Sequence, residues 1–253
     1  MTTVTVIDPD SGLVDYVYTT EPLPGGLPGQ TYVVTATDHD LADEQPWASY
    51  TIRNEYYLNG VVLDSIEAVM DDGSRVLFEN DYFGSLGFPT DYLDRWTLWD
   101  SQGRIDYMWE SSTPNMHGAT PETTTYRALD YDTATGNLDY SIIRYLDGRQ
   151  VSTDYDSATG NADYVLTEYS DGRVVAQDYN STTGLLDYVL TTQANGDRLA
   201  QDYDAAGRLD YVVENLADGR MVVTDYDLND QHGWWSYSIA YDAAGRISSV
   251  TVA

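Results

Sequence analysis

The sequence predicts an all-β fold: an antiparallel β-hairpin repeat, wound as a solenoid or spiral meander, with about 24 residues and two strands per repeat. Three observations predict it. An Asp-Tyr pair recurs between Asp130 and Tyr226, spaced by 24 residues three times and by 23 once. Apolar and polar side chains alternate with period two after each pair, as in half-buried strands. A glycine-containing turn sequence follows about every twelve residues.

The unit that begins at Asp154 illustrates the two strands of a repeat. Residues 149–155 and 162–169 alternate apolar with polar side chains and are rich in Val, Tyr and Thr. One such unit cannot bury an apolar face alone, so we expect neighbouring units to stack and the sheet to curl over its tyrosines. The tyrosines assigned to this covered face are Tyr155, Tyr164, Tyr179, Tyr188, Tyr203 and Tyr211.

Two kinds of turn join the strands, at residues 156–160 and 170–172. In each turn an Asp comes first and a Gly, which tolerates positive φ, closes it. The one repeat of 23 residues is shorter inside the turn at 204–207. Because this deletion leaves the strands intact, we expect the strand register to be unchanged.

The rest of the chain follows the same pattern less regularly. We predict a single continuous repeat domain over residues 1–253, with degenerate repeats in 1–98 and regular repeats in 99–253. No stretch has the composition of a linker between domains. Three segments that interrupt the pattern are interpreted as loop insertions: 22–30, 83–98 and 113–125.

A second type of repeat has a longer turn with three acidic residues. Its two copies are separated by a constant offset of 187 residues. Three carboxylates within six residues could converge on a hard cation such as Ca²⁺, although the spacing is not that of an EF-hand. Ca²⁺ is therefore the one cofactor predicted, and a solvated acidic turn is the alternative. The predicted metal ligands are Asp38, Asp40, Asp43, Asp225, Asp227 and Asp230.

The strands themselves also carry repeated carboxylates. If the hairpin register sets Asp154 opposite Asp163, the like charges destabilise the sheet unless a cation lies between them. The alternative is a register that avoids this pairing, while the second acid after each Asp-Tyr pair accepts hydrogen bonds from its own turn. The acids in that second position are Asp132, Asp156, Asp204 and Asp242.

The aromatic residues suggest a glycan-binding surface as a further possibility. The chain has 23 Tyr and six Trp but only three Phe. Most Tyr fall at core positions, and we interpret them as a stacked ladder. Trp96, Trp99 and Trp109 lie near the irregular insertions, where we expect them to be exposed. Exposed Trp beside acids and amides is typical of sugar-binding surfaces, so these three residues are the candidate glycan ligands.

Composition restricts the class of partner. The net charge is −30, with 42 acids against 12 bases, all of them Arg. A field of this sign repels nucleic acid and anionic membranes, so we predict neither nucleic-acid binding nor membrane insertion. There is no Cys, hence no disulfide, and no transmembrane or N-terminal signal sequence stands out. We predict an extracellular location by another export route, with a cytoplasmic location as the alternative.

A known repeat family resembles these units. Residues 203–209, Tyr-Asp-Ala-Ala-Gly-Arg-Leu, are followed by Asp218-Gly219 and by a new Asp-Tyr-Asp. This segment resembles the YD repeat of the bacterial Rhs family, as do residues 241–247. The resemblance covers most of 99–253 and, more loosely, the residues before it. It implies β-hairpin repeats, which in that family wind into spiral shells around toxins or form extracellular attachment proteins.

No catalytic residue is predicted. The sequence has no nucleophile elbow, HExxH motif or phosphate-binding loop, and its three His are dispersed. The function predicted is that of a non-enzymatic, secreted or cell-surface repeat protein with a structural or binding role, such as an adhesin or matrix module, with Ca²⁺ as a stabilising ion. The alternatives are a glycan-binding or carbohydrate-active protein that uses the Trp-bearing insertions, and a scaffold that self-associates through open sheet edges.

Overall fold

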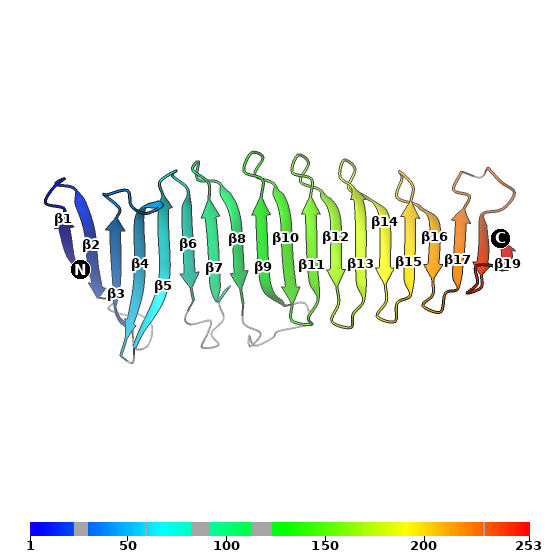
Figure 1. The fold of residues 1–253 in the computed structure, drawn as a ribbon, viewed down its shortest axis with the longest axis horizontal. Helices are drawn as coiled ribbons and strands as arrows, with labels where there is room; N and C mark the ends of the chain where they lie inside the picture. The colour runs from blue at the N-terminus through cyan, green and yellow to red at the C-terminus, as the bar shows by residue number, and fades with distance from the viewer. Residues whose placement is uncertain (23–29, 59, 82–91, 113–122, 230) are drawn as a thin grey trace. The chain divides into compact units, whose positions relative to one another are not determined.

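The computed structural model describes residues 1–22, 30–58, 60–81, 92–112, 123–229 and 231–253 (Figure 1). Over these ranges the chain forms nineteen β-strands and no helix. The predicted all-β, antiparallel hairpin architecture is therefore confirmed. The residues group into two compact units, 1–136 and 137–253, which are described separately as unit 1 and unit 2. A single continuous domain over the whole chain stays a prediction.

Unit 1 is an antiparallel meander in which each strand pairs with the strand that follows it in the chain. Part of the predicted insertion at 83–98 is wrong, because residues 94–98 alternate in character and form a strand. Most of the three predicted insertions lies outside the described residues. The strands are β1 (Thr2–Ile7), β2 (Val14–Pro22), β3 (Gln30–His39), β4 (Trp47–Tyr57), β5 (Gly60–Met70), β6 (Arg75–Asn80), β7 (Asp94–Trp99), β8 (Ile105–Ser111) and β9 (Thr124–Tyr131).

Unit 2 repeats the same arrangement more regularly. Its strands again pair in chain order and antiparallel. They are β10 (Leu138–Tyr145), β11 (Gln150–Tyr155), β12 (Ala162–Glu168), β13 (Val174–Asn180), β14 (Leu185–Thr192), β15 (Arg198–Tyr203), β16 (Leu209–Asn215), β17 (Met221–Tyr226), β18 (Ser236–Tyr241) and β19 (Ile247–Val252).

The turns form as their Asp and Gly residues predict. In the β10–β11 turn, the amide of Tyr145 donates to the carbonyl of Arg149, and the carboxylate of Asp147 accepts from the Arg149 amide at 2.8 Å. Gly148 has a φ of 83°, in the left-handed region that glycine favours. A Cβ at this position would lie 3.1 Å from Cβ of Ser170 in the next turn. Glycine is therefore favoured here for its φ, and a Cβ would also require the Ser170 side chain to shift by a few tenths of an ångström.

The shortened turn leaves the strand register intact, as predicted. In the longer form of the turn, the Asp156 amide donates to the carbonyl of Asn161. In the shorter form, the Asp204 amide donates to the carbonyl of Arg208. The flanking pairs are nevertheless equivalent, with Asp154 opposite Tyr164 and Asp202 opposite Tyr211.

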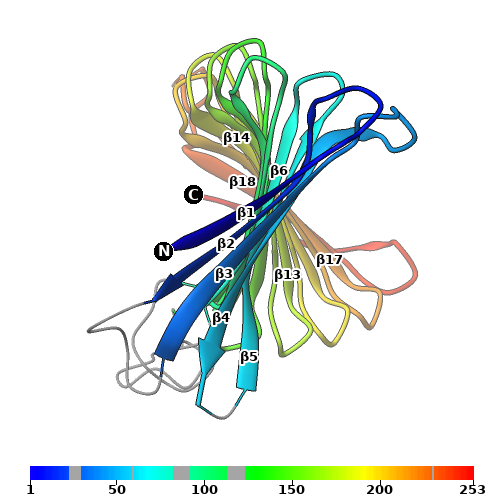
Figure 2. The same ribbon diagram turned by 90° about the vertical axis from the view of Figure 1, so that its left-hand side faces the viewer.

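Each unit is one layer of sheet. Strands make extensive contacts only with their neighbours in the chain, and successive strands twist relative to one another, as the blue-to-cyan strands of unit 1 show in Figure 2. The expected curling of the sheet over its tyrosines was wrong for unit 2, where Tyr164 is 40% exposed. Few of the described residues are buried, and most of them are small: Val33, Val34, Thr97 and Ala128 in unit 1, and Ser141, Thr153, Thr167, Val189, Val212 and Ser236 in unit 2.

The two tyrosines of a repeat lie on opposite faces, which corrects the prediction of one tyrosine face. Directly paired residues of an antiparallel sheet point to the same side, and Tyr164 pairs with Asp154, not with Tyr155. A β-bulge between Asp154 and Tyr155 leaves Asp163 without an opposite residue, and Tyr155 pairs with Ala162. We call the two sides of unit 2 the Tyr164 face and the Tyr155 face.

Small residues on the Tyr155 face are covered by the larger side chains around them. The hydroxyls of Ser141 and Tyr155 lie 3.3 Å apart, within hydrogen-bonding distance. Ser141 is buried, as is Thr153, its direct partner in the ladder. The Tyr155 face therefore holds the closest approach to a core that unit 2 possesses.

Candidate functional site

A row of alternating tyrosines and aspartates crosses the Tyr164 face of unit 2. Each member is the direct ladder partner of the next, so all eight side chains share one face. Neighbouring strands lie about 4.8 Å apart, so equivalent residues recur about every 9.6 Å. We call this set the tyrosine–aspartate row: Tyr140, Asp154, Tyr164, Asp178, Tyr188, Asp202, Tyr211 and Asp225.

The side chains of this row are exposed. The four tyrosines keep between 37% and 40% of their surface accessible to solvent, although their rings are largely apolar. The four aspartates are also exposed. No hydrogen bond or ion pair to any of these eight side chains occurs within the described ranges. The row therefore presents four rings and four carboxylates to solvent.

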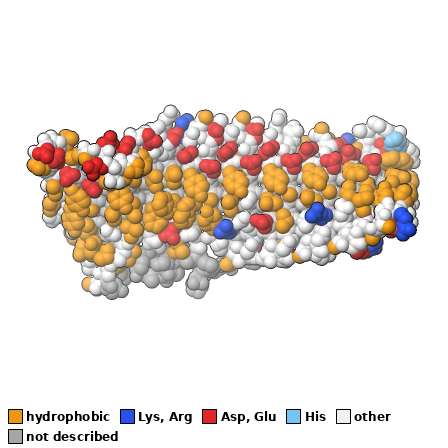
Figure 3. Space-filling view, viewed as in Figure 1, with side chains coloured by type: hydrophobic (Ala, Val, Ile, Leu, Met, Phe, Trp, Pro, Cys, Tyr) orange, Lys and Arg blue, Asp and Glu red, His pale blue; other side chains and the backbone are white. Residues whose placement is uncertain are grey.

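An apolar row runs beside the tyrosine–aspartate row on the same face. Its members are also ladder partners of one another, and they lie two residues after the tyrosines and two residues before the aspartates. Figure 3 shows a face with this pattern, an apolar band bordered by carboxylates. The larger members of the apolar row are Ile142, Leu166, Leu190, Val213, Val223 and Ile239.

The electrostatics of the tyrosine–aspartate row are one-sided. It contains four acids and no base. The two Arg side chains on this face, Arg144 and Arg198, stand one row beyond the apolar band, and Arg144 donates to the Gln150 amide oxygen at 2.7 Å. The carboxylates of the row thus keep their negative potential unopposed at close range.

The turn carboxylates, in contrast, accept hydrogen bonds from residues of their own turns. Asp156 accepts from the amide and the hydroxyl of Thr159 at 2.7 and 2.9 Å, and these hydrogen bonds lower its pKa. Asp204 accepts from the amide and guanidinium of Arg208, which lower its pKa likewise. The same arrangement occurs at Asp132 and Asp242. The predicted alternative is confirmed: the register separates Asp154 from Asp163, and the second acid binds its own turn.

The two copies of the acidic turn have the same local geometry. In both, a strand acid pairs with a tyrosine: Asp38 with Tyr50, and Asp225 with Tyr237. The next acid accepts a hydrogen bond from a backbone amide at 2.6 Å. This bond runs from Gln45 to Asp40 in the first copy and from His232 to Asp227 in the second. The offset of 187 residues therefore marks a real structural repeat.

These turns differ from a ligand cage in how they place the acids. Asp38 and Asp225 lie in strands between tyrosines, while Asp40 and Asp227 bind turn amides. Partial desolvation raises the pKa of Asp227, but hydrogen bonds from the amides of Gln231 and His232 outweigh it, so the pKa is lowered. Asp43 is exposed and has a φ of 55°, in the left-handed region.

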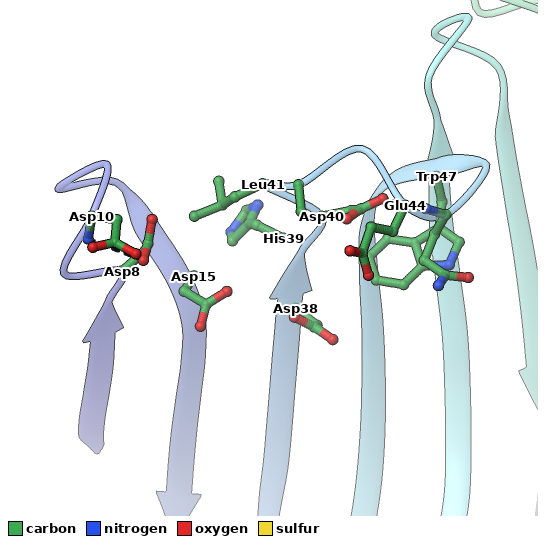
Figure 4. Close-up of a pocket in the computed structure, with 11 residues that line it drawn as sticks. Asp8, Asp10, Asp15, Asp38, His39, Asp40, Leu41, Glu44 and Trp47 are labelled. Atoms are coloured by element: carbon green, nitrogen blue, oxygen red, sulfur yellow. Dashed lines mark hydrogen bonds between the residues drawn. The ribbon is translucent and has the colours of Figure 1, made fainter.

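Unit 1 has an open acidic hollow beside the first of these turns. It measures about 530 Å³ and is lined by residues of the β1–β2 and β3–β4 turns and the adjoining strand ends. Figure 4 shows Asp8, Asp10 and Asp15 on one side and Asp40 and Glu44 on the other. Asp71 follows β5 nearby, and its pKa is raised by partial desolvation and then by the charges of Asp43, Asp40 and Asp72. The region is thus strongly negative.

Within the described residues, no group of three or more His, Asp or Glu side chains is arranged to hold a metal ion. Asp230, one of the six predicted ligands, lies outside those residues. Calcium binding at the acidic turns therefore stays a prediction. Thermal melting with and without CaCl₂ tests it, because an ion that binds only the folded chain raises Tm.

The three candidate glycan-binding tryptophans do not share one surface. Trp96 pairs directly with Trp109 and, on its other side, with Phe78, whose ring centroid lies 5.4 Å from that of Trp96. Trp99 lies three residues further along β7 and therefore on the opposite face, where the Arg75 guanidinium is 4.6 Å from its ring centroid. Trp96 is exposed, whereas Trp109 and Trp99 are half-buried.

The chain matches no protein-family model and no curated protein. In the ranges that the structure describes, no helix is long and apolar enough to cross a membrane.

The tyrosine–aspartate row is the feature that sequence reasoning missed. Alternation within a strand correctly separates Asp154 from Tyr155 and Asp163 from Tyr164. The relation between two strands depends on the register, which the bulge shifts by one residue. The available signal was the pair of acids in the hairpin, because the register that avoids pairing them places Asp154 opposite Tyr164 and leaves Asp163 without an opposite residue.

Proposed function

We propose that this protein is a non-enzymatic repeat protein, secreted or displayed at a cell surface, that acts by binding an extended partner along its sheet face. The observation that carries this proposal is the tyrosine–aspartate row, whose eight side chains are exposed and have no partner within the described residues. The resemblance of residues 203–209 to YD repeats supports an extracellular attachment role.

The form of the surface favours a linear partner over a small molecule. The row is open and periodic, and it offers the same Asp–Tyr pair on three successive hairpins of unit 2. One such contact on an open surface is weak, but a polymer that engages several at once gains affinity through effective concentration. Small-molecule sites are instead concave and enclose most of their ligand.

A panel of immobilised polymers tests this function. The panel holds a neutral glycan, a polycation, a polyanion and a hydrophobic polymer, and binding of the full chain is measured by surface plasmon resonance. We expect binding to at least one polymer. A variant with serine in place of the four exposed ring residues, Tyr140, Tyr164, Tyr188 and Tyr211, should lose most of it.

The matched control replaces tyrosines of the other face. Tyr179→Ser and Tyr203→Ser change the same residue type on the Tyr155 face, where each pairs with a leucine across the bulge. These changes should leave polymer binding unchanged in protein that is still folded by circular dichroism. Equal binding by the wild type and the four-serine variant, or no binding to any polymer, would contradict the proposal.

Glycan binding through unit 1 is a second candidate. Trp96 pairs with Trp109 on one side and with Phe78 on the other, so three aromatic side chains lie in a row on one face, and exposed aromatic rings suit the apolar faces of sugar rings. A glycan array tests it. Trp96→Ala should abolish the array signal, while Trp99→Ala, on the opposite face, should leave it unchanged.

A further inference from the structure

We propose that the tyrosine–aspartate row binds a cationic polypeptide in the polyproline II conformation, with Lys or Arg at every third residue. This inference rests on the proposed function and names the partner class for the same surface. It follows from three properties of the row: unpaired negative charge, exposed aromatic rings and a fixed spacing.

Charge complementarity selects a cation. Asp154, Asp178, Asp202 and Asp225 are exposed, and none of them has an ion-pair partner in the described part of the chain. The chain as a whole carries a charge of −30 and has no Lys. A partner with positive side chains is therefore drawn to this face at long range and finds free carboxylates at short range.

The tyrosines supply the second half of a cation site. A cation above an aromatic ring is attracted by the ring's electron-rich face. The chain already uses this contact elsewhere: the guanidinium of Arg173 lies 3.7 Å from the ring centroid of Tyr169, and that of Arg149 lies 4.1 Å from that of Tyr145. In the described part of unit 2 no Arg lies over a ring of the tyrosine–aspartate row, so each ring and its adjacent carboxylate are open to a cation from a partner.

The spacing selects the conformation of the partner. Carboxylates of the row recur every two strands, about 9.6 Å apart. A polyproline II helix has three residues per turn and rises about 3.1 Å per residue, so every third side chain points the same way at intervals of about 9.3 Å. An extended β-strand repeats on one face at about 6.6 Å or 13 Å and does not match.

The apolar row beside the carboxylates fits the rest of such a peptide. Leu166 and Leu190 lie in the same strands as Tyr164 and Tyr188, two residues away on the same face. Proline rings between the cationic residues can lie against this band while the cations reach the aspartates. Proline-rich chains dock on aromatic surfaces in this way at low entropic cost, because they are already extended.

Fluorescence anisotropy with a labelled peptide of four Lys-Pro-Pro triplets tests the proposal on the full chain. A peptide of the same twelve residues with its four lysines contiguous controls for charge, and a Glu-Pro-Pro peptide controls for conformation. We expect the triplet peptide to bind about fivefold or more tightly than the contiguous one, since only the former fits several sites at once. The Glu peptide should not bind.

Single substitutions locate the site. Asp178→Asn should weaken binding of the triplet peptide about fivefold, the loss expected for one cation site. Glu214→Gln makes the same charge change on the Tyr155 face, where Glu214 is exposed and opposite Leu199, and should have no effect. Tyr188→Phe, which keeps the ring, should bind like the wild type. Tyr188→Leu, which removes it, should weaken binding about threefold.

The outcomes separate this inference from the proposed function. Equal affinity for the two lysine peptides, or equal effects of Asp178→Asn and Glu214→Gln, would overturn the polyproline II partner. If the triplet peptide fails while another polymer of the panel binds through the four tyrosines, the proposed function stands and this inference falls. If neither binds, both fall.

Discussion

The aspartates of the turns and those of the strands in unit 2 are the same side chain used in opposite ways. Asp156 accepts hydrogen bonds from the amide and hydroxyl of Thr159, whereas Asp154, two residues earlier, has no partner within the described residues. The turn acid stabilises the chain locally. The strand acid contributes charge to a surface. Neighbouring acids in a repeat can therefore be separated into those that maintain the fold and those available for binding.

The largest effect is expected from the turn backbone. Gly148→Ala places a Cβ in the left-handed region and 3.1 Å from Cβ of Ser170, so it should cost more than the roughly 1–2 kcal/mol of the conformation alone. Gly184→Ala shares the positive φ but has open space around its Cβ, so it should cost only that conformational part. Urea unfolding of both variants measures the difference, and equal midpoints would show that the contact with Ser170 is relieved without cost.

A direct test of the comparison removes one acid of each kind. Asp156→Ala should lower Tm by about 2–4 °C, the shift typical of a lost hydrogen-bonding group in a chain of this size. Asp154→Ala should leave Tm within about 1 °C, as surface substitutions usually do. Calorimetry on both variants measures this. A larger drop for Asp154→Ala would mean that the strand acids also stabilise the sheet.

The turn acids also predict how stability depends on pH. Hydrogen bonds to the turn backbone lower the pKa of Asp132, Asp156 and Asp242 in the folded chain. A lowered folded pKa adds stability that is present above the unfolded pKa and is lost as pH falls through the folded value. Tm should therefore fall steeply below about pH 4. Asp156→Asn should flatten this acid limb, and an unchanged limb would assign it to other groups.

The smallest effect concerns repulsion within the row. Asp154, Asp178 and Asp202 follow one another along the face, and each lies about 9.6 Å from the next. This distance is close to the Debye length at physiological salt. Replacing all three with Asn should raise Tm by about 1 °C at low ionic strength, and the gain should disappear in 1 M NaCl. A gain that persists in high salt would point to a cause other than charge.

Much of this fold could be predicted from the sequence because its signals are local. Three features depend on a few adjacent residues: alternation within strands, the turns that run from Asp to Gly, and the unchanged strand register beside the shortened turn at 204–207. The offset of 187 residues also corresponds to a shared turn geometry, because Asp40 and Asp227 bind equivalent amides.

The faces and the candidate site could not be predicted in the same way. Whether Tyr155 and Tyr164 share a face depends on one bulge, at Asp163, which no local propensity specifies. The expectation of a covered tyrosine face assumed that apolar area must be buried by curling. In unit 2 the burial occurs instead among small residues such as Ser141 and Thr153 on the other face.

The turn at 204–207 has a consequence for how such a chain can change over generations. Since a residue can be lost there without disturbing the pairs on either side, a whole hairpin could be copied or excised between equivalent turns and the ladder would close again. The length of the sheet would then be set by the number of copies in the gene, a quantity that recombination alters in single events.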